Sequence, residues 1–419
     1  MKAFWEIFRL EWRAATRSKA LPATAVASLA WMICAPWVLV GDGFEFSVRY
    51  TLGIVFAVLL IALSASAAGS VAKERAGKRL QLTLARPVRS FTVALGRMAA
   101  FASMGSAVLA ACAAVLWMRT PSRSCHHVIA PDMEPAEAVV DRAFAKYMAE
   151  SQAFRESVER DGEGPYRRYL ATHLGLVEDF QRIGPGSSTN WTFSAGSVSA
   201  GVPLGAEIRF MGMFGLHNDV RGVLRLGPLE SAVDADSQRV LRIPLGTPAS
   251  PAGADGKIRL EFANAGADAL MVSPRRDVRL LADAGPFGMN LFRAWLQLSA
   301  LLAFVVSLGV FLGSFLGRSV AVFTMMSFLF IMTLSPELMD EYPDPTGQDA
   351  LDRICTRISE LSASAASPFS SYRPIGLLVE DHCVEWPSTF RAVSVNAVLI
   401  PLLLSLLSGA AMRRTGAQD

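Results

Sequence analysis

The chain has 419 residues, of which 52% are hydrophobic and 18% charged, with a formal net charge of +3. This charged fraction is below the roughly 25% of soluble domains, and the charged residues lie outside several long charge-free runs. The pattern excludes one large soluble core and predicts membrane spans. The small net charge and its distribution give no nucleic-acid-binding surface, so we expect no nucleic acid partner.

Residues 1–20 predict a helix that lies in the membrane interface among lipid headgroups. In helical projection the large aromatic side chains fall on one side, namely Phe4, Trp5, Phe8 and Trp12. The basic residues Arg9, Arg13 and Arg17 fall on the other side, which is typical of an interfacial helix. Glu11 falls toward the aromatic side and is the one residue that does not fit. The segment lacks the apolar core of a cleavable signal peptide, so we expect none.

Six uncharged runs predict six transmembrane helices, at residues 21–40, 51–72, 98–118, 294–317, 319–336 and 392–412. Each is close to the about 20 residues that a hydrocarbon layer of roughly 30 Å requires. Every second connection is basic: the N-terminal segment, residues 73–97, the turn at Arg318 and the tail with Arg413 and Arg414. Because Lys and Arg mark the cytoplasmic side, we expect both termini in the cytoplasm and the chain in the inner (cytoplasmic) membrane.

The loop at residues 73–97 lies between the second and third predicted spans and has one acidic residue, Glu74, among its basic ones. Leu80 and Leu84 alternate with basic and polar residues, including Arg79. Pro87 ends any helix near Arg86, because proline lacks an N–H and restricts the residue before it. The pattern predicts a short basic helix on the inner membrane face, followed by a turn into the next span. Such a helix is a surface for a soluble partner, although an ordinary cytoplasmic loop is also basic.

The order of particular residues in this loop resembles a pattern found in ABC-2 type transporter permeases: Glu74, Gly77, Leu84, Pro87-Val88-Arg89 and Gly96-Arg97. In that family the segment forms a coupling helix that docks on a separate ATP-binding subunit, and an elbow helix like residues 1–20 precedes the first span. The resemblance implies that ATP and Mg are bound by the partner subunit and that a second permease subunit pairs with this one. It favours export over import, although the sequence itself gives neither the substrate nor the direction of transport. It covers the six-span skeleton and not the insertion between spans three and four.

That insertion, residues 119–288, predicts an extracytoplasmic α+β domain between residues 1–118 and 289–419. Residues 135–160 and 165–183 have helical texture, and five short strand-like runs follow, at 206–210, 222–226, 239–245, 257–262 and 277–281. Ile258, Leu260 and Phe262 alternate with Arg259 and Glu261, as in a half-buried strand. The size and spacing suit a small β-sandwich. The fold class is therefore an α-helical polytopic membrane protein with an α+β outer domain.

The outside loop at residues 337–391 predicts an amphipathic helix at 349–364 and an apolar segment at 368–378 that dips into the membrane surface. Three cysteines fall outside, Cys125, Cys355 and Cys383, and two of them can form a disulfide in an oxidising compartment. With the neighbouring histidines they can also hold a soft metal ion, but their spacing matches no closed site, so we expect no metal.

No motif for nucleotide binding or hydrolytic chemistry is present. The sequence lacks G-x-x-x-x-G-K-[ST], H-E-x-x-H and G-x-S-x-G, and the predicted spans contain no ionisable group of the kind that marks an ion pathway. We therefore expect a non-catalytic membrane subunit with no cofactor of its own. Two other interpretations remain. One is a lipid-extracting permease like those of lipopolysaccharide transport, and the other is a membrane-anchored extracytoplasmic binding or sensory protein.

Overall fold

A computed structural model describes residues 2–38, 44–76, 89–120, 123–172, 180–194, 198, 201–212, 219–237, 239–248, 256–340 and 373–416. The chain divides into two compact units. The first comprises Met1–Ser124, Pro286–Met339 and Ile358–Asp419, and the second comprises Cys125–Gly285 and Asp340–Arg357. The outer domain predicted at residues 119–288 thus corresponds to the main segment of the second unit. The described parts of each unit are treated separately below.

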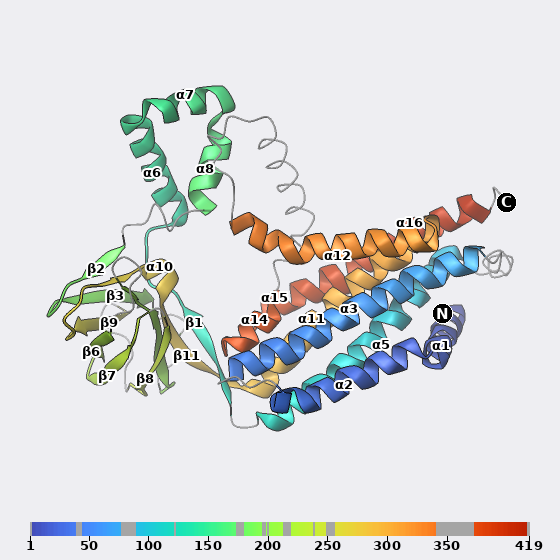
Figure 1. Cartoon of the computed structure of the whole chain (residues 1–419), viewed down its shortest axis with the longest axis horizontal. Coiled ribbons are helices and arrows are strands. Elements are labelled where there is room, and N and C mark those ends of the chain that lie inside the picture. The colour runs from blue at the N-terminus through green and yellow to red at the C-terminus, as the bar shows by residue number, and fades with distance from the viewer. Residues whose placement is uncertain are drawn as a thin grey trace. The chain divides into compact units, whose positions relative to one another are not determined.

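The first unit is helical (Figure 1). Its helices are α1 (Lys2–Arg17), α2 (Ala20–Val38), α3 (Phe44–Ala76), α5 (Ser90–Arg119), α11 (Phe287–Phe315), α12 (Arg318–Asp340), α14 (Pro374–Val379), α15 (Trp386–Ala392), the π-helix η3 (Val393–Leu399) and α16 (Ile400–Gly416). Helix α11 packs on α3, α5 and α16, and these elements share one apolar core. Leu59, Leu63 and Leu302 lie in that core.

Among the described residues, four helical stretches are long and apolar enough to cross a membrane: Val48–Arg75, Ser90–Arg119, Phe287–Phe315 and Trp386–Arg413. A fifth is present if α1 and the first part of α2, which meet at an angle of 70°, count as one span. Residues Arg318–Phe330 form a shorter apolar helix. The structure therefore agrees with membrane insertion, whereas the count of six spans stays a prediction.

The outward faces of these helices support the same conclusion. Many large apolar side chains on them are exposed, among them Val26, Ile54, Val58, Ile61, Phe323, Phe330, Leu403 and Leu406. Scattered exposed apolar residues are ordinary in a soluble protein, but rows of them along long apolar helices suit contact with hydrocarbon.

The helices extend beyond the charge-free runs from which they were predicted. Helix α3 begins at Phe44 and continues to Ala76, and α11 begins at Phe287. Arg49 and Arg293 therefore lie within helices. A long basic side chain near a helix end is tolerated there, because it can reach a polar partner or water. The predicted loop at 73–97 is correspondingly shorter. Its two ends belong to α3 and α5, and residues 77–88 lie outside the described residues.

The last long helix contains an irregular turn. In η3 the N–H of Ile400 donates to the carbonyl of Val395, a spacing of five residues that defines a π-helix. Pro401 follows directly and has no N–H to donate. The widened turn therefore lies directly before the proline. A proline within an apolar helix is tolerated when other groups satisfy the carbonyl that it leaves without a hydrogen bond.

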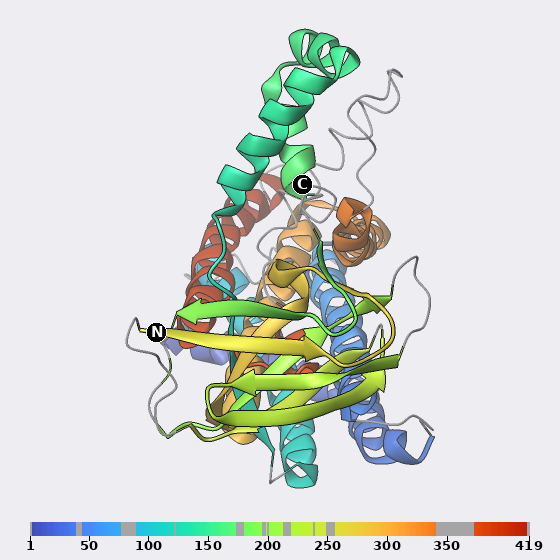
Figure 2. The same ribbon diagram turned by 90° about the vertical axis from the view of Figure 1, so that its left-hand side faces the viewer.

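The second unit contains antiparallel sheets formed by β1 (Ser124–Ile129), β2 (Gln181–Ile183), β3 (Ser188–Ser194), β4 (Leu204–Arg209), β5 (Met211–Gly212), β6 (Asp219–Leu226), β7 (Leu229–Asp236), β8 (Val240–Gly246), β9 (Lys257–Asn264), β10 (Leu270–Val272) and β11 (Val278–Pro286) (Figure 2). Two sheets have four strands, ordered β1-β11-β4-β8 and β3-β9-β6-β7, and a third is ordered β2-β10-β5. Side chains from both four-stranded sheets share one core, where the rings of Phe210 and Phe262 lie 4.5 Å apart. The predicted sandwich-like arrangement is therefore present.

The alternation predicted for residues 257–262 is confirmed, since Ile258, Leu260 and Phe262 are fully buried. The second predicted helix is wrong at its end. Helix α8 (Glu163–Thr172) stops well before residue 183, and residues 181–183 form strand β2. The first predicted helix is divided into α6 (Ala136–Glu150) and α7 (Gln152–Asp161), because the hydroxyl of Ser151 caps α7 by accepting a hydrogen bond from Phe154 N–H.

The main segment of the second unit begins with β1 and ends with β11, which are neighbouring strands of one sheet. We therefore predict that residues 124–286 fold without the rest of the chain, because the sandwich and the small core of α6–α8 are formed within this stretch. Circular dichroism of the purified fragment should show a mixed β and α spectrum with a cooperative thermal transition. A fragment ending at residue 277 would lack β11 and is the control that should not fold. A disordered spectrum for residues 124–286 would contradict the prediction.

Candidate functional site

The residues predicted to form the coupling segment divide into two groups. Glu74, Arg89 and Gly96 are described, at or near the ends of α3 and α5. The others lie in residues 77–88, outside the described residues, namely Gly77, Arg79, Leu80, Leu84, Arg86 and Pro87. The candidate site is therefore the set of contacts that hold the two flanking helices. This end of the first unit is called the Arg97 end below.

The central feature of the Arg97 end is a buried group of three charges from three helices. The Nε of Arg97 on α5 lies 3.0 Å from the Oε1 of Glu11 on α1. The Nη2 of the same guanidinium donates to Oε2 of Glu74, in the last turn of α3. The side chains of Arg97 and Glu11 are only 3% and 7% exposed, and that of Glu74 is 29% exposed. The group therefore ties α1, α3 and α5 together, with Arg97 and Glu11 buried and Glu74 partly exposed.

Burial makes this group sensitive to the loss of any member. Moving a charge out of water costs several kcal/mol, and only close opposite charges with good hydrogen bonds offset it. The contact with Glu11 is close but not aligned as a hydrogen bond, and Arg97 Nη1 has no hydrogen-bond partner among the described residues. Glu74 lies near the negative end of its helix dipole, which gives the carboxylate a further need for a cation.

Helix α1 is also held against α5 by close packing. A Cβ atom on Gly96 would lie 3.0 Å from Cγ2 of Ile7, so a larger residue would separate the helices. One turn further along α1, the indole Nε1 of Trp12 donates to Ser103 Oγ at 2.9 Å. Phe8 and Trp12 pack on the core, whereas Trp5 is 56% exposed. The predicted aromatic side of the elbow helix is therefore partly covered by α5 and is not wholly available to lipid.

Two further contacts tie the flanks of residues 77–88 to the rest of the first unit. The guanidinium of Arg75 donates to the carbonyls of Ser314 and Leu316, at 3.2 and 2.7 Å, and so caps the end of α11. Ser90, the first residue of α5, donates to the carbonyl of Gly409 at 3.0 Å and accepts from Arg413 Nε at 3.1 Å. The last turn of α3 thus contacts α5 and α11, and the first turn of α5 contacts α16.

Sequence reasoning identified part of this arrangement. Glu74, Gly96 and Arg97 belong to the motif that it singled out, but Glu11 was the residue that did not fit, and Arg75 and Ser90 had no assigned contact. The misplaced Glu11 was the available signal, because a carboxylate on the apolar side of a helix requires a cation from elsewhere.

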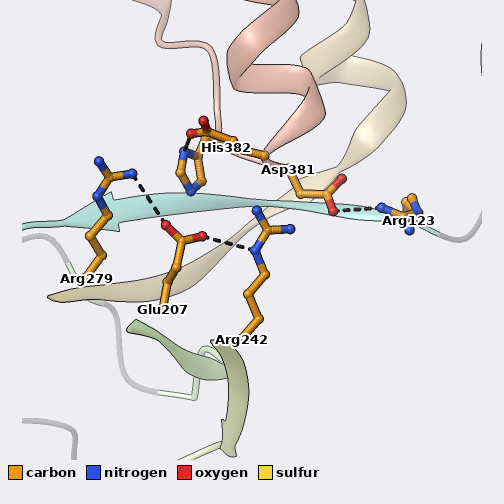
Figure 3. A network of polar contacts seen from close by, with 7 residues as sticks. Arg123, Glu207, Arg242, Arg279, Asp381 and His382 are labelled. Carbon is orange, nitrogen blue, oxygen red and sulfur yellow. Dashed lines mark hydrogen bonds and ion pairs between the residues drawn. The ribbon is translucent and has the colours of Figure 1, made fainter. Parts of the chain in front are cut away.

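The opposite end of the first unit has a second polar cluster, around residues 380–386. Asp381 has a positive φ of 51°, and its Oδ2 forms an ion pair with Arg123 Nη1 at 2.7 Å (Figure 3). Asn290 on α11 donates to the carbonyl of His382 and accepts from Val384 N–H, at 2.8 and 2.6 Å. Arg293 lies over the ring of Trp386. The segment between α14 and α15 is therefore clamped on α11. Of the predicted dipping segment at 368–378, residues 368–372 lie outside the described residues, and the rest includes α14.

In the second unit, Glu207 on β4 lies between two arginines on the neighbouring strands. Its Oε2 is 3.0 Å from Arg242 Nε, and its Oε1 is 3.4 Å from Arg279 Nη1 (Figure 3). Register places all three directly opposite one another across β11, β4 and β8. This is cross-strand pairing of opposite charges, which stabilises a sheet and needs no ligand.

The cysteines show no disulfide within the described residues. Cys125 and Cys383 are buried, and Cys355 lies outside that part of the chain. No cluster of three or more His, Cys, Asp or Glu side chains that suits a metal ion occurs among the described residues. No protein-family model, curated protein or solved structure matches this chain.

Proposed function

We propose that this chain is the membrane subunit of an ATP-driven transporter of the ABC-2 permease type, working in export. A separate ATP-binding subunit would hold ATP and Mg and dock on residues 77–88. A second permease subunit, the same or related, would complete the transporter. The observation that carries the proposal is the anchoring of both flanks of residues 77–88 by buried or capping contacts to α1, α5, α11 and α16.

These contacts supply a way to transmit force. A displacement of residues 77–88 by a partner would act on Glu74 and Arg75 at one flank and on Ser90 at the other. Because Glu74 is paired with Arg97, and Arg75 caps α11, the helices would move together as a body. Rigid-body rotation of packed helices is a common form of switching, and the partner drives it by binding the two states with different affinity.

The second unit would receive or hand on the substrate outside the membrane. Its core is formed within one continuous insertion, and the chain connects to α5 and α11 through neighbouring strands. Motion of those two helices would therefore reach β1 and β11 directly. The proposed membrane is the inner membrane, with both termini cytoplasmic and the second unit outside.

The proposed orientation predicts which sites an impermeant thiol reagent can reach. In a parent with Cys34 and Cys355 replaced by serine, Ser187→Cys should be labelled in intact cells stripped of any outer membrane. Lys73→Cys should be labelled only after permeabilisation. Both positions are exposed, whereas Ser90, at the other flank of residues 77–88, is buried and hydrogen-bonded and so is unsuitable for labelling. Labelling of Lys73→Cys before permeabilisation would overturn the orientation.

The function itself is tested by reconstitution. The purified full-length chain should bring with it an ATP-binding protein, and the pair in liposomes should hydrolyse ATP. An anchored binding or sensory protein would purify without such a partner. A lipid-extracting permease would also bring an ATPase, and is separated from the main proposal by whether labelled glycolipid leaves the membrane during hydrolysis.

A further inference from the structure

The first unit contains an apolar groove that the transport proposal does not use. It has a volume of about 360 Å³ and lies between α1, α2, α3 and α5. Its walls include Trp12, Leu29, Leu59 and Met104. The indole Nε1 of Trp12 donates a hydrogen bond to Ser103 Oγ at 2.9 Å, which orients this side chain.

The groove is elongated along the helices. Leu21, Ala25 and Leu29 line it at every fourth residue of α2, which corresponds to about 12 Å along the helix axis. Its floor is closed at Gly105, where a Cβ atom would lie 2.3 Å from Leu302 and 2.5 Å from Leu63. The shape is therefore a closed-bottomed trough parallel to the helices, as a hydrocarbon chain requires.

Water is a poor occupant for this trough. The hydroxyls on its lining belong to Thr16 and Thr24, and both donate to backbone carbonyls of their own helices, at 3.2 and 2.9 Å. A buried water needs two to four polar partners, and an apolar cavity of about 150 Å³ remains dry but binds benzene. A larger apolar trough on a helix that contacts lipid is suited to a hydrocarbon ligand.

The trough is lined on both sides of the bend between α1 and α2, by Thr16 before it and Leu21 after it, and basic residues are exposed at this bend. Arg13, Arg17 and Lys19 are exposed at the bend between α1 and α2, next in sequence to lining residues Trp12, Thr16 and Leu21. Within the described part of the chain, Arg13, Arg17 and Lys19 form no ion pair, so these three cations are available to a ligand. Each Lys or Arg near a membrane surface attracts anionic lipid.

We propose that the trough binds one acyl chain of an anionic phospholipid, with its headgroup at Arg13, Arg17 and Lys19. The acyl chain would fill the space between α1 and the α3–α5 pair, and so would hold helix α1 against the other helices of the first unit. This site requires insertion in a membrane, but it does not depend on a partner ATPase or on transport.

The test uses the full-length chain in phosphatidylcholine nanodiscs that contain phosphatidylglycerol with a diazirine on one acyl chain. After illumination, mass spectrometry should find adducts concentrated on peptides that cover residues 12–29 and 104–111. The double variant Ala25→Phe with Ala107→Phe fills the trough and should lose most of these adducts. The matched control is Ala23→Phe with Ala27→Phe, at exposed positions of α2 that do not line the trough, and it should keep them.

Headgroup recognition is tested without touching the trough. Arg13→Gln with Arg17→Gln should lower the phosphatidylglycerol adduct by about fivefold for each cation removed, and leave that of phosphatidylcholine carrying the same diazirine unchanged. The proposal fails if adducts are spread evenly over the exposed faces of α3 and α16, or if the trough-filling variant retains them while it elutes as a folded protein. It also fails if Ala107→Cys forms a disulfide between two copies and no lipid adduct appears, since a second chain would then cover the trough.

Discussion

Replacing Arg97 with methionine will lower the free energy of unfolding by about 3–5 kcal/mol, the range for removing one partner of a buried ion pair. The side chain is 3% exposed and faces the carboxylates of Glu11 and Glu74. Without the guanidinium, a buried carboxyl group, Glu11, and a partly exposed one, Glu74, lose the cation that they share. Denaturation of the purified chain in mixed micelles measures the loss.

Two comparison variants make this result specific. The triple variant Arg97→Met with Glu11→Gln and Glu74→Gln removes all three charges and should recover most of the stability, since neutral replacements remove the desolvation penalty. Arg142→Met breaks an exposed pair with Glu134 and should cost at most about 1 kcal/mol. If Arg97→Met is no more harmful than Arg142→Met, the three buried charges do not hold the helices together.

Reversing the charge at Arg79 and Arg86 together will weaken binding of the ATP-binding subunit by about tenfold or more, which corresponds to roughly 1.4 kcal/mol or more. These residues carry the basic character of the proposed docking segment. Glu74→Gln acts differently, because its carboxylate faces Arg97 within the bundle. That variant should retain the partner but lose ATP-dependent transport. Copurification and transport in liposomes measure the two effects separately.

The matched control for the charge reversal is Arg155→Glu, an exposed arginine on α7 in the second unit. This substitution replaces a positive charge with a negative one, as each of the two reversals in residues 77–88 does. It should leave partner binding unaltered. If all three variants bind the partner and transport equally well, residues 73–97 act only as a topogenic loop, and the proposed coupling role is wrong. If Glu74→Gln loses the partner as well, Glu74 belongs to the docking surface and the division between binding and transmission fails.

Local sequence patterns determined the elements of this protein well. Charge-free runs predicted the long apolar helices, because only long stretches without polar side chains can face hydrocarbon. The period-two alternation at Ile258, Leu260 and Phe262 predicted a half-buried strand. Where a local pattern was weak, the prediction failed. Strand β7 carries mostly polar and small residues, and β1 contains two adjacent histidines, so neither resembled a strand before its partners were known.

The candidate site shows what a local pattern cannot provide. A helical projection of residues 1–20 places side chains between lipid and water only, and in that picture Glu11 is an error. The tertiary structure adds a third environment, the face of α5, where Arg97 supplies the missing charge. The same applies to Arg75 and Ser90, whose partners lie on α11 and α16. Spacing along the chain decides which residues share a face, but the pairing of buried charges depends on which helices pack together, and packing brings residues far apart in sequence into contact.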